Sequence, residues 1–269
     1  MPFAKSNYAR IYWRMRGAEA QPVLVLLCGI GTEQGLYDRA APFLSNQFRL
    51  LRIDNRGHGA SDAPAGDYDL ATLAGDVRAV MDQAGVSRAV VCGTSLGAMI
   101  AMALALDAPQ RIDGLVLACT SAQMDAAFWA QRIATVRDKG MAAIADVAVS
   151  RFFSPDFAHR NRGIVDTLRR GLLTMSPNGY AGCAAAIRDM DLLPRIGAIA
   201  APTLVMSAAL DLATPPEGHG DLIAATIPGA ESVVLKSGHL ACVEQPEAFA
   251  EAIASFARRC VTFGHGATI

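Results

Sequence analysis

The segment Gly93-Thr94-Ser95-Leu96-Gly97 carries the clearest chemical signal in the sequence, because it fits the pattern G-x-S-x-G. It follows a short aliphatic run and begins a helical stretch, so it predicts a tight turn from a strand into a helix. Such a turn lifts the serine hydroxyl above the sheet, and the helix N-terminus behind it favours developing negative charge. We therefore expect Ser95 to be a nucleophile. The alternative is an ordinary helix N-cap in a glycine-rich turn.

A serine hydroxyl is too weak an acid to attack unaided, so it needs a base and a group that orients the base. His239 follows the aliphatic run Ser232–Gly238 and is therefore expected on a loop just beyond a strand. Asp211 also follows an apolar run, one strand earlier in the chain. The order serine, aspartate, histidine is a known order of a catalytic triad. We expect Ser95, Asp211 and His239 to be the catalytic residues.

Other histidines and carboxylates have weaker positions along the chain. His58 lies in the glycine-rich loop Arg56-Gly57-His58-Gly59 and is expected to be structural or to support the site from behind. Asp54 ends a strand but shares its loop with Arg56, which we expect it to brace. The remaining rivals lie in polar, helical or tail segments: His159, His219, His265, Asp191 and Asp221.

The tetrahedral intermediate of an acyl transfer needs two N–H donors for its oxyanion. One donor is expected to be the backbone amide of Leu96, which directly follows the serine. The other is expected in the loop Cys28–Thr32, where glycines on both sides of Ile30 allow a close approach. The sequence therefore predicts an oxyanion hole formed by the N–H groups of Ile30 and Leu96.

Short aliphatic runs alternate with helical periodicity along most of the chain, which predicts an α/β fold with a mostly parallel, doubly wound sheet. The expected parallel strands are Val23–Cys28, Phe48–Asp54, Ala89–Gly93, Gly114–Cys119, Thr203–Ala208 and Ser232–Gly238. The segment Ala9–Gly17 is expected to add an antiparallel edge strand. The expected amphipathic helices are Leu70–Ala84, Leu96–Asp107 and Glu247–Arg259.

The alternation breaks once, between residues 121 and 195, where helical periodicity continues without a strand run. A helical insertion between two strands is expected to pack as a lid over one end of the sheet. The chain is therefore divided into a core of residues 1–120 and 196–269 and a helical cap of residues 121–195. The tail from Cys260 to Ile269 is expected to be loosely held.

The composition describes a globular chain of 269 residues, 52% hydrophobic and 18% charged. A formal net charge of −1 offers no broad cationic face, so neither nucleic acid nor a membrane surface is an expected partner. The uncharged run Ala89–Leu106 has the length of a membrane span, but its central Gly93–Gly97 indicates a strand turning into a helix. Six cysteines without a CxxC pair and the lack of a visible signal peptide predict a reduced, cytoplasmic protein. No motif indicates a metal or a cofactor.

The same motifs resemble those of a known family, the α/β-hydrolases. The resemblance rests on Asp54–Gly59 with Ser61-Asp62, on the turn around Ser95, and on Ser237-Gly238-His239 followed by Glu244–Phe249. More narrowly, the chain is similar to the 3-oxoadipate enol-lactonases of aromatic-acid breakdown. Most α/β-hydrolases carry a His-Gly pair in the loop that here ends Gly31-Thr32, and enol-lactonases commonly lack that histidine. This chain has Cys28 there.

The expected cap is also similar to the cap of enol-lactonases, in segments that include Phe128–Ile133 and Arg151–Phe153. The resemblance implies that Trp129 and Arg132 face the substrate. The alternative is that both only pack the cap helix, with Arg132 paired to a nearby acid. The implied substrate is a small lactone or ester bearing a carboxylate, which Arg132 or another cap arginine would pair with. A homodimer is compatible with these expectations.

The resemblance implies opening of 3-oxoadipate enol-lactone to 3-oxoadipate through a Ser-His-Asp triad and an acyl-enzyme. A short-chain carboxylesterase and an N-acyl homoserine lactonase are alternatives within the same fold. A ligand-binding protein without catalysis is an alternative from another class. The complete set of Ser95, Asp211 and His239 argues against it, because a pure binder has no need of all three.

Overall fold

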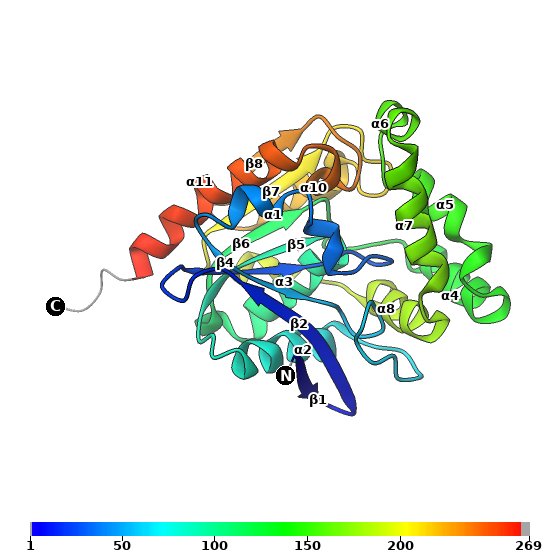
Figure 1. Cartoon of the computed structure of the whole chain (residues 1–269), viewed down its shortest axis with the longest axis horizontal. Coiled ribbons are helices and arrows are strands. Elements are labelled where there is room, and N and C mark those ends of the chain that lie inside the picture. Colours follow the sequence, from blue (N-terminus) through cyan, green and yellow to red (C-terminus); the bar gives the residue numbers. More distant parts are fainter. Residues whose placement is uncertain (1, 265–269) are drawn as a thin grey trace.

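The six aliphatic runs form the adjacent parallel strands of one eight-stranded sheet, in a computed structural model that describes residues 2–264 (Figure 1). The strand order across the sheet is β1-β2-β4-β3-β5-β6-β7-β8. The strands are β1 (Phe3–Ser6), β2 (Ala9–Arg16), β3 (Val23–Leu27), β4 (Arg49–Ile53), β5 (Ala89–Thr94), β6 (Ile112–Ala118), β7 (Thr203–Ala208) and β8 (Glu231–Leu235). Strands β3 to β8 pair in parallel, as the sequence predicts.

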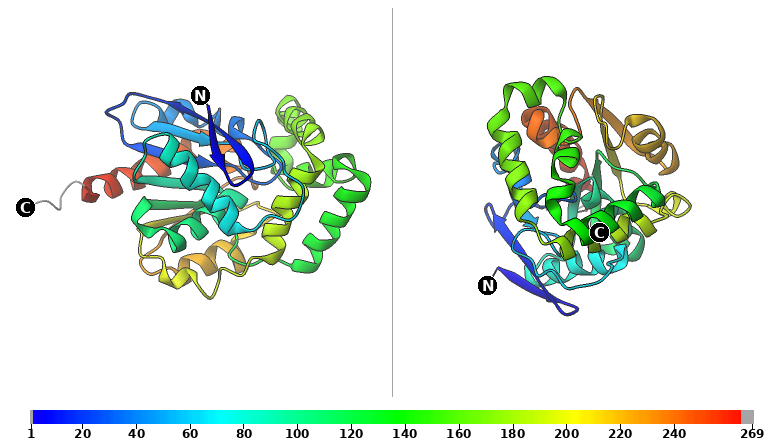
Figure 2. Two further views of the ribbon diagram at one scale, coloured as in Figure 1. Left: turned by 90° about the horizontal axis from the view of Figure 1, so that it is seen from below. Right: turned by 90° about the vertical axis from the view of Figure 1, so that its right-hand side faces the viewer.

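Helices cover both faces of this sheet (Figures 1 and 2). In the core they are α1 (Ala41–Leu44), α2 (Leu70–Gln83), α3 (Leu96–Asp107), α9 (Asp221–Thr226), α10 (Ala241–Glu244) and α11 (Pro246–Gly264). Helices α2 and α3 pack together on one face, and α1 and α11 pack together on the other. Every residue of β5 and β7 is buried, because both faces of the central strands are covered.

Between β6 and β7 the chain forms helices but no strand, apart from one isolated bridge between Gln123 and Asp191, and the main helices lie together at one end of the sheet (Figure 1). They are α4 (Ala126–Lys139), α5 (Ala145–Ser150), α6 (Pro155–Arg160), α7 (Arg162–Thr174) and α8 (Pro177–Asp189). The predicted helical cap is therefore present. Its exact limits at residues 121 and 195, and its standing as a separate domain, stay predictions.

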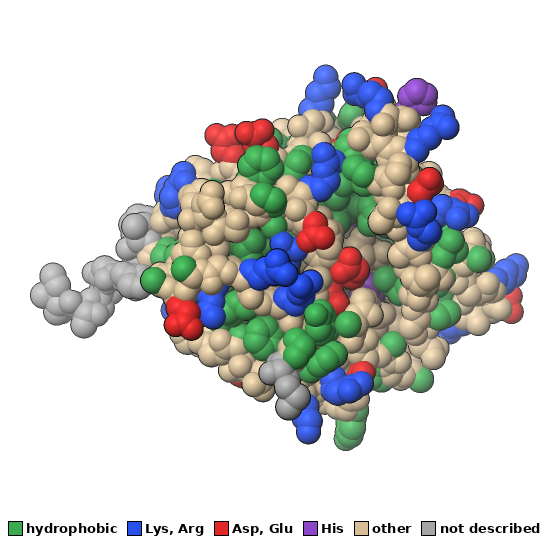
Figure 3. Space-filling view, in the orientation of Figure 1, with side chains coloured by type: hydrophobic (Ala, Val, Ile, Leu, Met, Phe, Trp, Pro, Cys, Tyr) green, Lys and Arg blue, Asp and Glu red, His purple; other side chains and the backbone are tan. Residues whose placement is uncertain are grey.

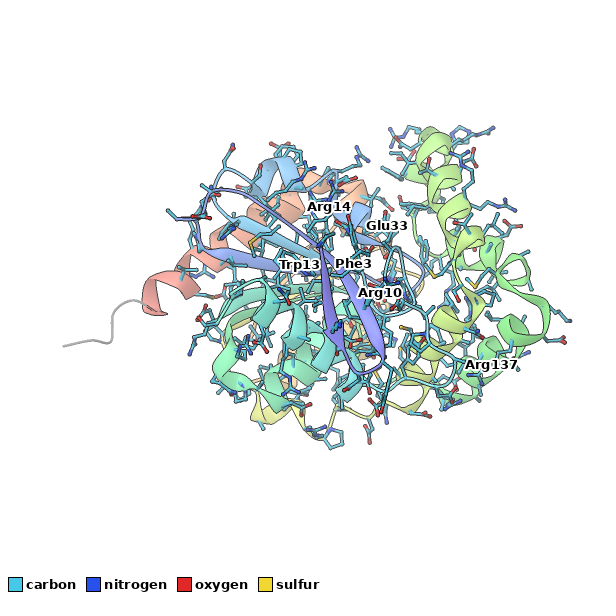
Figure 4. The ribbon with its side chains drawn as sticks, turned by 60° about the horizontal axis from the view of Figure 1, so that its bottom comes forward. Phe3, Arg10, Trp13, Arg14, Glu33 and Arg137 are labelled. Atoms are coloured by element: carbon cyan, nitrogen blue, oxygen red, sulfur yellow. The ribbon has the colours of Figure 1, made fainter. Side chains whose placement is uncertain are left out.

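Two charged residues of the core hold the cap in place. Asp67 pairs with Arg137 of α4 and with Arg188 of α8, the latter at 3.0 Å. Figure 4 shows Arg137 on the cap side of the molecule. Glu244 of α10 accepts hydrogen bonds from the amide and the hydroxyl of Ser154, at 2.6 and 2.8 Å. These are two of the places at which the cap is fastened to the core.

The N-terminal strands differ from the prediction in one respect. Strand β2 pairs antiparallel with β4, as expected, but β1 pairs with its other side and forms the edge of the sheet. The hairpin turns at Asn7 and Tyr8, both with positive φ. At this edge Arg10 lies over the ring of Phe3, 5.5 Å from its centroid (Figure 4). The four residues of β1 are too few to form a recognisable alternating pattern.

Two predictions, on helix Leu96–Asp107 and on the C-terminal tail, differ from the structure, and the prediction for the uncharged run is confirmed. Helix α3 is buried on all sides from Leu96 to Ala105 and is therefore not amphipathic. Helix α11 continues to Gly264 and Cys260 is buried, so the tail is held further than expected; residues 265–269 lie outside the described part. The uncharged run from Ala89 divides into β5 and α3, as predicted, and no helix among the described residues is long and apolar enough to cross a membrane.

The cysteines and the surface charges agree with the composition. All six cysteines are buried and unpaired. On the face shown in Figure 3, acidic side chains are interspersed with basic ones, and this face carries no broad cationic patch. The charges therefore give no support to a nucleic-acid or membrane partner on this side of the molecule.

Candidate active site

Ser95 lies in the tight turn between β5 and α3, in a strained backbone conformation. Its φ of 56° and ψ of −117° are rare for a residue with a side chain and mark a functional position in many proteins. The flanking glycines make the turn feasible. A Cβ on Gly93 would lie 2.2 Å from the carbonyl carbon of Gly97, and a Cβ on Gly97 would lie 2.2 Å from the Leu27 oxygen. Only glycine fits at both places.

Asp211 and His239 come together beyond the ends of β7 and β8, as the sequence predicts. His239 Nδ1 donates to Asp211 Oδ2 at 2.7 Å, and both side chains are buried. The other carboxylate oxygen accepts from the amides of Ala213 and Thr214, at 2.7 and 2.9 Å. Burial acts to raise the pKa of Asp211, but the His239 ring and these hydrogen bonds together hold it below its usual value. Asp211 therefore stays ionised and fixes the orientation of the imidazole.

The His239 ring faces a cavity that also contains Ser95. Phe152 of the cap stacks against the ring, with centroids 6.4 Å apart and planes 18° from parallel. Glu244 accepts from the amide of Gly238 at 3.0 Å and so fixes the loop that carries His239. Within residues 2–264 no hydrogen bond joins the Ser95 hydroxyl to this ring, and in enzymes without substrate such bonds are often long. The structure therefore places the three residues at one site.

The loop between β3 and η1 (Gln34–Tyr37) contacts this site from the side of Ser95. Residues Gly29 to Thr32 form a tight turn, closed by the Thr32 amide donating to the Gly29 carbonyl at 3.3 Å. Gly31 has a φ of +79° there, which favours glycine. A Cβ on Gly29 would lie 3.4 Å from the Cβ of Ser95, so the turn touches the serine. Among the described residues, the N–H groups of Ile30 and Leu96 have no hydrogen-bond acceptor.

The loop after β4 holds this turn in place through hydrogen bonds. Asn55 donates to the Cys28 carbonyl at 2.8 Å, and Asp54 accepts from the Gln34 amide at 2.8 Å. We expected Asp54 to brace Arg56, and this prediction is wrong. Instead Arg56 makes a buried ion pair with Asp76 of α2, with contacts of 2.6 and 2.8 Å.

Cys28 directly precedes this turn, at the place where most α/β-hydrolases carry a different residue. Its side chain points away from the site. Its thiol is fully buried, where burial raises its pKa well above the usual value. Its Sγ lies 3.7 Å from the Ile53 carbonyl, on the core side of β3. The part of Cys28 that affects the turn is its backbone carbonyl, which accepts from Asn55.

The cavity above Ser95 encloses about 60 Å³ and is lined mostly by apolar side chains. These come from both the core and the cap: Ile30, Met99, Met124, Phe128, Ala148, Phe152, Ile187 and Ala213. Polar groups lie at two places. Ser95, Thr214 and His239 form one group, and Trp129, Arg132, Arg151 and Tyr180 of the cap form the other.

Trp129 and Arg132, which the resemblance implies face the substrate, both line this cavity. Trp129 is 8% exposed, and its indole N–H has no hydrogen-bond partner in the described structure. Arg132 donates to the Tyr180 hydroxyl at 3.3 Å and lies over the ring of Phe128, 5.1 Å from its centroid. Among the described residues it makes no ion pair with an acid, so the structure gives no support to the alternative in which it pairs with a nearby carboxylate.

Arg151 is a cavity residue that the sequence did not single out. Its Nε and Nη2 donate to the Leu212 carbonyl at 3.2 and 2.8 Å, beside Asp211. Its guanidinium lies 5.5 Å from the centroid of Phe128, so Arg132 and Arg151 share one aromatic ring. No described carboxylate lines the cavity with them. The cavity therefore contains two cations without an acidic partner.

The rival residues lie elsewhere. Asp191 is exposed, and its carboxylate accepts from Gln123 at 3.4 Å. Asp221 is exposed at the start of α9. His219 contacts the Ser121 hydroxyl at 2.9 Å, and His159 is exposed on α6. His265 lies outside the described residues. Within the described chain no group of three histidine, cysteine or acidic side chains could hold a metal ion.

Comparison with known proteins gives consistent matches over almost the whole chain. The family model of the alpha/beta hydrolase fold matches residues 22–246. The 3-oxoadipate enol-lactonase 2 of Acinetobacter baylyi is 32% identical over 254 residues, which are 94% of this chain and 93% of that protein.

Two solved structures are similar in both sequence and fold. A hydrolase from Pseudomonas aeruginosa is 43% identical with a TM-score of 0.91, over 94% of this chain and 97% of that chain. The enol-lactonase from Burkholderia xenovorans is 34% identical with a TM-score of 0.92, over 95% and 99% respectively. The chain therefore belongs to the α/β-hydrolase family, with the similarity to enol-lactonases that its motifs predict, and is an enzyme of the hydrolase class.

Proposed function

We propose that this enzyme is a serine hydrolase that opens a small lactone bearing a carboxylate. One observation carries the proposal: a single cavity is lined by Ser95, by His239 with Asp211 behind it, and by two cap arginines that have no acidic partner among residues 2–264. The first group supplies a nucleophile with its base. The second supplies positive charge for an anionic part of the substrate.

In the proposed reaction, His239 removes the Ser95 proton as the serine oxygen attacks the lactone carbonyl. Asp211 holds the imidazole in the tautomer that leaves Nε2 free to accept that proton, and it stabilises the imidazolium that forms. The free N–H groups of Ile30 and Leu96 stabilise the tetrahedral oxyanion, each contributing about 10²- to 10³-fold to turnover. The ring carbon–oxygen bond then breaks, giving an ester of Ser95.

The leaving oxygen stays attached to the acyl group, because the ester was cyclic. His239 gives the proton it took from Ser95 to the leaving enol oxygen, and the enol then becomes a ketone. An enol leaves readily, so this step needs only weak acid catalysis from His239. Water then attacks the acyl-enzyme while His239 accepts its proton, and Ser95 leaves as the hydroxyl with the proton returned to it. The product is an open-chain acid with one more carboxylate than the substrate.

The cap residues are proposed to bind the substrate carboxylate. A buried indole N–H without an acceptor costs about 1–3 kcal/mol, and a substrate oxygen at Trp129 would remove that cost. Arg132 keeps donors beyond the one given to Tyr180, and Arg151 keeps donors beyond the two given to Leu212. These three side chains give the site its preference for an acidic substrate.

The proposed substrate is 3-oxoadipate enol-lactone, because relatives similar over nearly their whole length bear the name enol-lactonase. The location proposed is the cytoplasm, whose reducing conditions suit six unpaired thiols. A short-chain carboxylesterase and an N-acyl homoserine lactonase are the alternatives, since both would use the same catalytic residues without needing the arginines.

The test is a substrate panel with product analysis. The purified enzyme is offered the enol-lactone, p-nitrophenyl acetate and an N-acyl homoserine lactone, and kcat/KM is measured for each. We expect the acidic enol-lactone to be preferred by about 10²-fold or more, since a charge-assisted hydrogen bond contributes about 1.5–3 kcal/mol. An equal or higher kcat/KM for either neutral compound would contradict the substrate assignment, and no hydrolysis of any would contradict the enzyme class.

A further inference from the structure

His58 lies directly behind the turn that contains Ile30. The side chain is 1% exposed and belongs to a glycine-rich loop whose residues 54–58 are all buried. Its Nε2 accepts a hydrogen bond from the Gly31 amide at 3.0 Å, and its Nδ1 lies 3.1 Å from the Arg56 carbonyl. The ring therefore links the loop after β4 to the turn beside Ser95.

These two contacts determine which ring nitrogen carries the proton. A backbone N–H only donates, so Nε2 must be an unprotonated acceptor, and Nδ1–H then donates to the Arg56 carbonyl. A protonated ring would direct an Nε2–H toward the Gly31 N–H. Burial, with no facing carboxylate, lowers the pKa of His58 to about 4, so the ring is neutral at neutral pH. The Cys183 thiol also lies near Nδ1, at 3.8 Å.

The contact with Gly31 determines the form of the turn. Ile30 and Gly31 are its two central residues, and the φ of +79° at Gly31 is typical of a type II turn. Types I and II differ by a flip of the peptide between the central residues, and that peptide contains the Gly31 N–H. A fixed acceptor at His58 Nε2 therefore favours one orientation over the other.

We propose that His58 is a positioning residue: by fixing the Gly31 N–H it holds the whole turn, and with it the Ile30 N–H of the preceding peptide, at the position where the oxyanion forms. This role rests on the proposed function. His58 does not touch the substrate; it acts through Gly31. Asn55 at the Cys28 carbonyl fixes the other end of the same short segment, so Ile30 is held from both sides. Without His58 the transition state should lose stabilisation, whereas binding of the substrate before the oxyanion forms should not change.

The test compares two substitutions at His58. In His58→Gln the side-chain oxygen can occupy the place of Nε2 and accept from Gly31, whereas His58→Leu has similar volume and no acceptor. Cys183→Ala is the matched control, because it loosens packing on the opposite side of the ring and leaves the acceptor in place. For each variant we measure kcat and KM with p-nitrophenyl acetate, the melting temperature, and inhibition by a trifluoromethyl ketone. This ketone adds to a serine hydroxyl to give an oxyanion.

We expect His58→Leu to lower kcat about 10²-fold and to weaken ketone inhibition by a similar factor, with KM within about twofold. His58→Gln should stay within about tenfold of wild type in both. Cys183→Ala should lower the melting temperature while kcat is kept. A Leu variant that is folded and retains wild-type kcat and ketone affinity would overturn the role, as would equal losses in the Gln and Leu variants.

The same experiment distinguishes this inference from the proposed function. If wild type hydrolyses p-nitrophenyl acetate and Ser95→Ala does not, the function stands, and the His58 variants decide the positioning role alone. If wild type neither hydrolyses the ester nor binds the ketone, there is no oxyanion site, and both proposals are overturned. A fluorophosphonate titration gives the fraction of folded sites, so that kcat is calculated per competent molecule.

Discussion

The sheet core and the cap hold their polar side chains in different ways. In the core, Asp211 accepts from His239 and from two backbone amides within 2.9 Å, and the turn beside Ser95 is fixed by Asn55 and His58. In the cap, Arg132 lies against aromatic rings and makes a single hydrogen bond of 3.3 Å.

Under the proposed function, this difference separates the residues of catalysis from those that select the substrate. Groups that carry out proton transfer must be held within about 0.5 Å of the productive position, and the buried backbone contacts of the core provide this. A carboxylate can be bound by a guanidinium in several geometries, so the cap side chains need less precise support. We therefore expect core substitutions to lower kcat and cap substitutions to raise KM for acidic substrates.

The largest expected effect is that of Ser95→Ala. It should lower kcat by about 10⁶-fold, because the nucleophile is lost while the fold is unaffected. The measurement is turnover of the preferred lactone, with circular dichroism and the melting temperature as controls for folding. Hydrolysis near the wild-type rate by the folded variant would show that another group in the core attacks the substrate.

The next effect is that of Asp211→Asn, which should lower kcat by about 10⁴-fold because the imidazole loses its required tautomer. Asp191→Asn is the matched control. That residue is exposed in the cap segment and its carboxylate accepts from Gln123, so its substitution should leave kcat within about twofold. If Asp191→Asn lowered kcat strongly and Asp211→Asn did not, the catalytic acid would lie in the cap. Catalysis would then not be confined to the core.

A smaller effect is expected in the cap. Arg132→Ala and Arg151→Ala should each raise KM for an acidic lactone by about 10- to 100-fold and change KM for a neutral ester by less than about threefold. Arg137→Ala is the control, since this arginine of α4 pairs with Asp67 outside the cavity. Equal effects on acidic and neutral substrates would show that the arginines only support the cap.

The smallest expected effect concerns acid stability and involves only the core. The pKa of His58 is about 4 in the folded chain, against an ordinary value of 6.5. Between these pH values the unfolded chain binds a proton that the folded chain does not, so the free energy of unfolding falls as the pH falls. His58 should account for about 2 kcal/mol of this loss at pH 5 relative to pH 7.

Urea unfolding at pH 7 and pH 5 measures this loss. His58→Gln has no titrating group and should show a correspondingly smaller difference between the two pH values than wild type. The depressed pKa of Asp211 does not interfere, because its contribution is lost only at lower pH. A pH dependence unchanged by the substitution would show that the His58 ring is protonated in the folded protein at pH 5.

The sequence was sufficient to predict the strands and the residues at their ends, because short runs of neighbouring residues indicate them. Buried parallel strands appear as aliphatic runs, and Ser95, Asp211 and His239 each lie at the end of such a run. Since parallel strands end at one edge of the sheet, these residues could be expected to meet there. The hydrogen bond between Asp211 and His239 agrees with that expectation.

What the sequence did not predict depends on contacts between distant segments. Arg56 pairs with Asp76 of α2 instead of the nearer Asp54, because Asp54 is already used by the Gln34 and Ala60 amides. Arg151 enters the cavity because the Leu212 carbonyl anchors it across 61 positions of sequence. Both arginines lie in segments that carry the family resemblance, but no local pattern there shows which distant group each one contacts.

The most direct test of the account is labelling of the folded enzyme with a fluorophosphonate, followed by mass spectrometry of its peptides. The account predicts one adduct per chain, on Ser95, and a strongly reduced rate of labelling in His239→Ala, since the base that activates the hydroxyl is gone. A folded enzyme that hydrolyses the lactone while Ser95 stays unlabelled, or that labels equally fast without His239, would contradict the claim that these residues act as one catalytic unit.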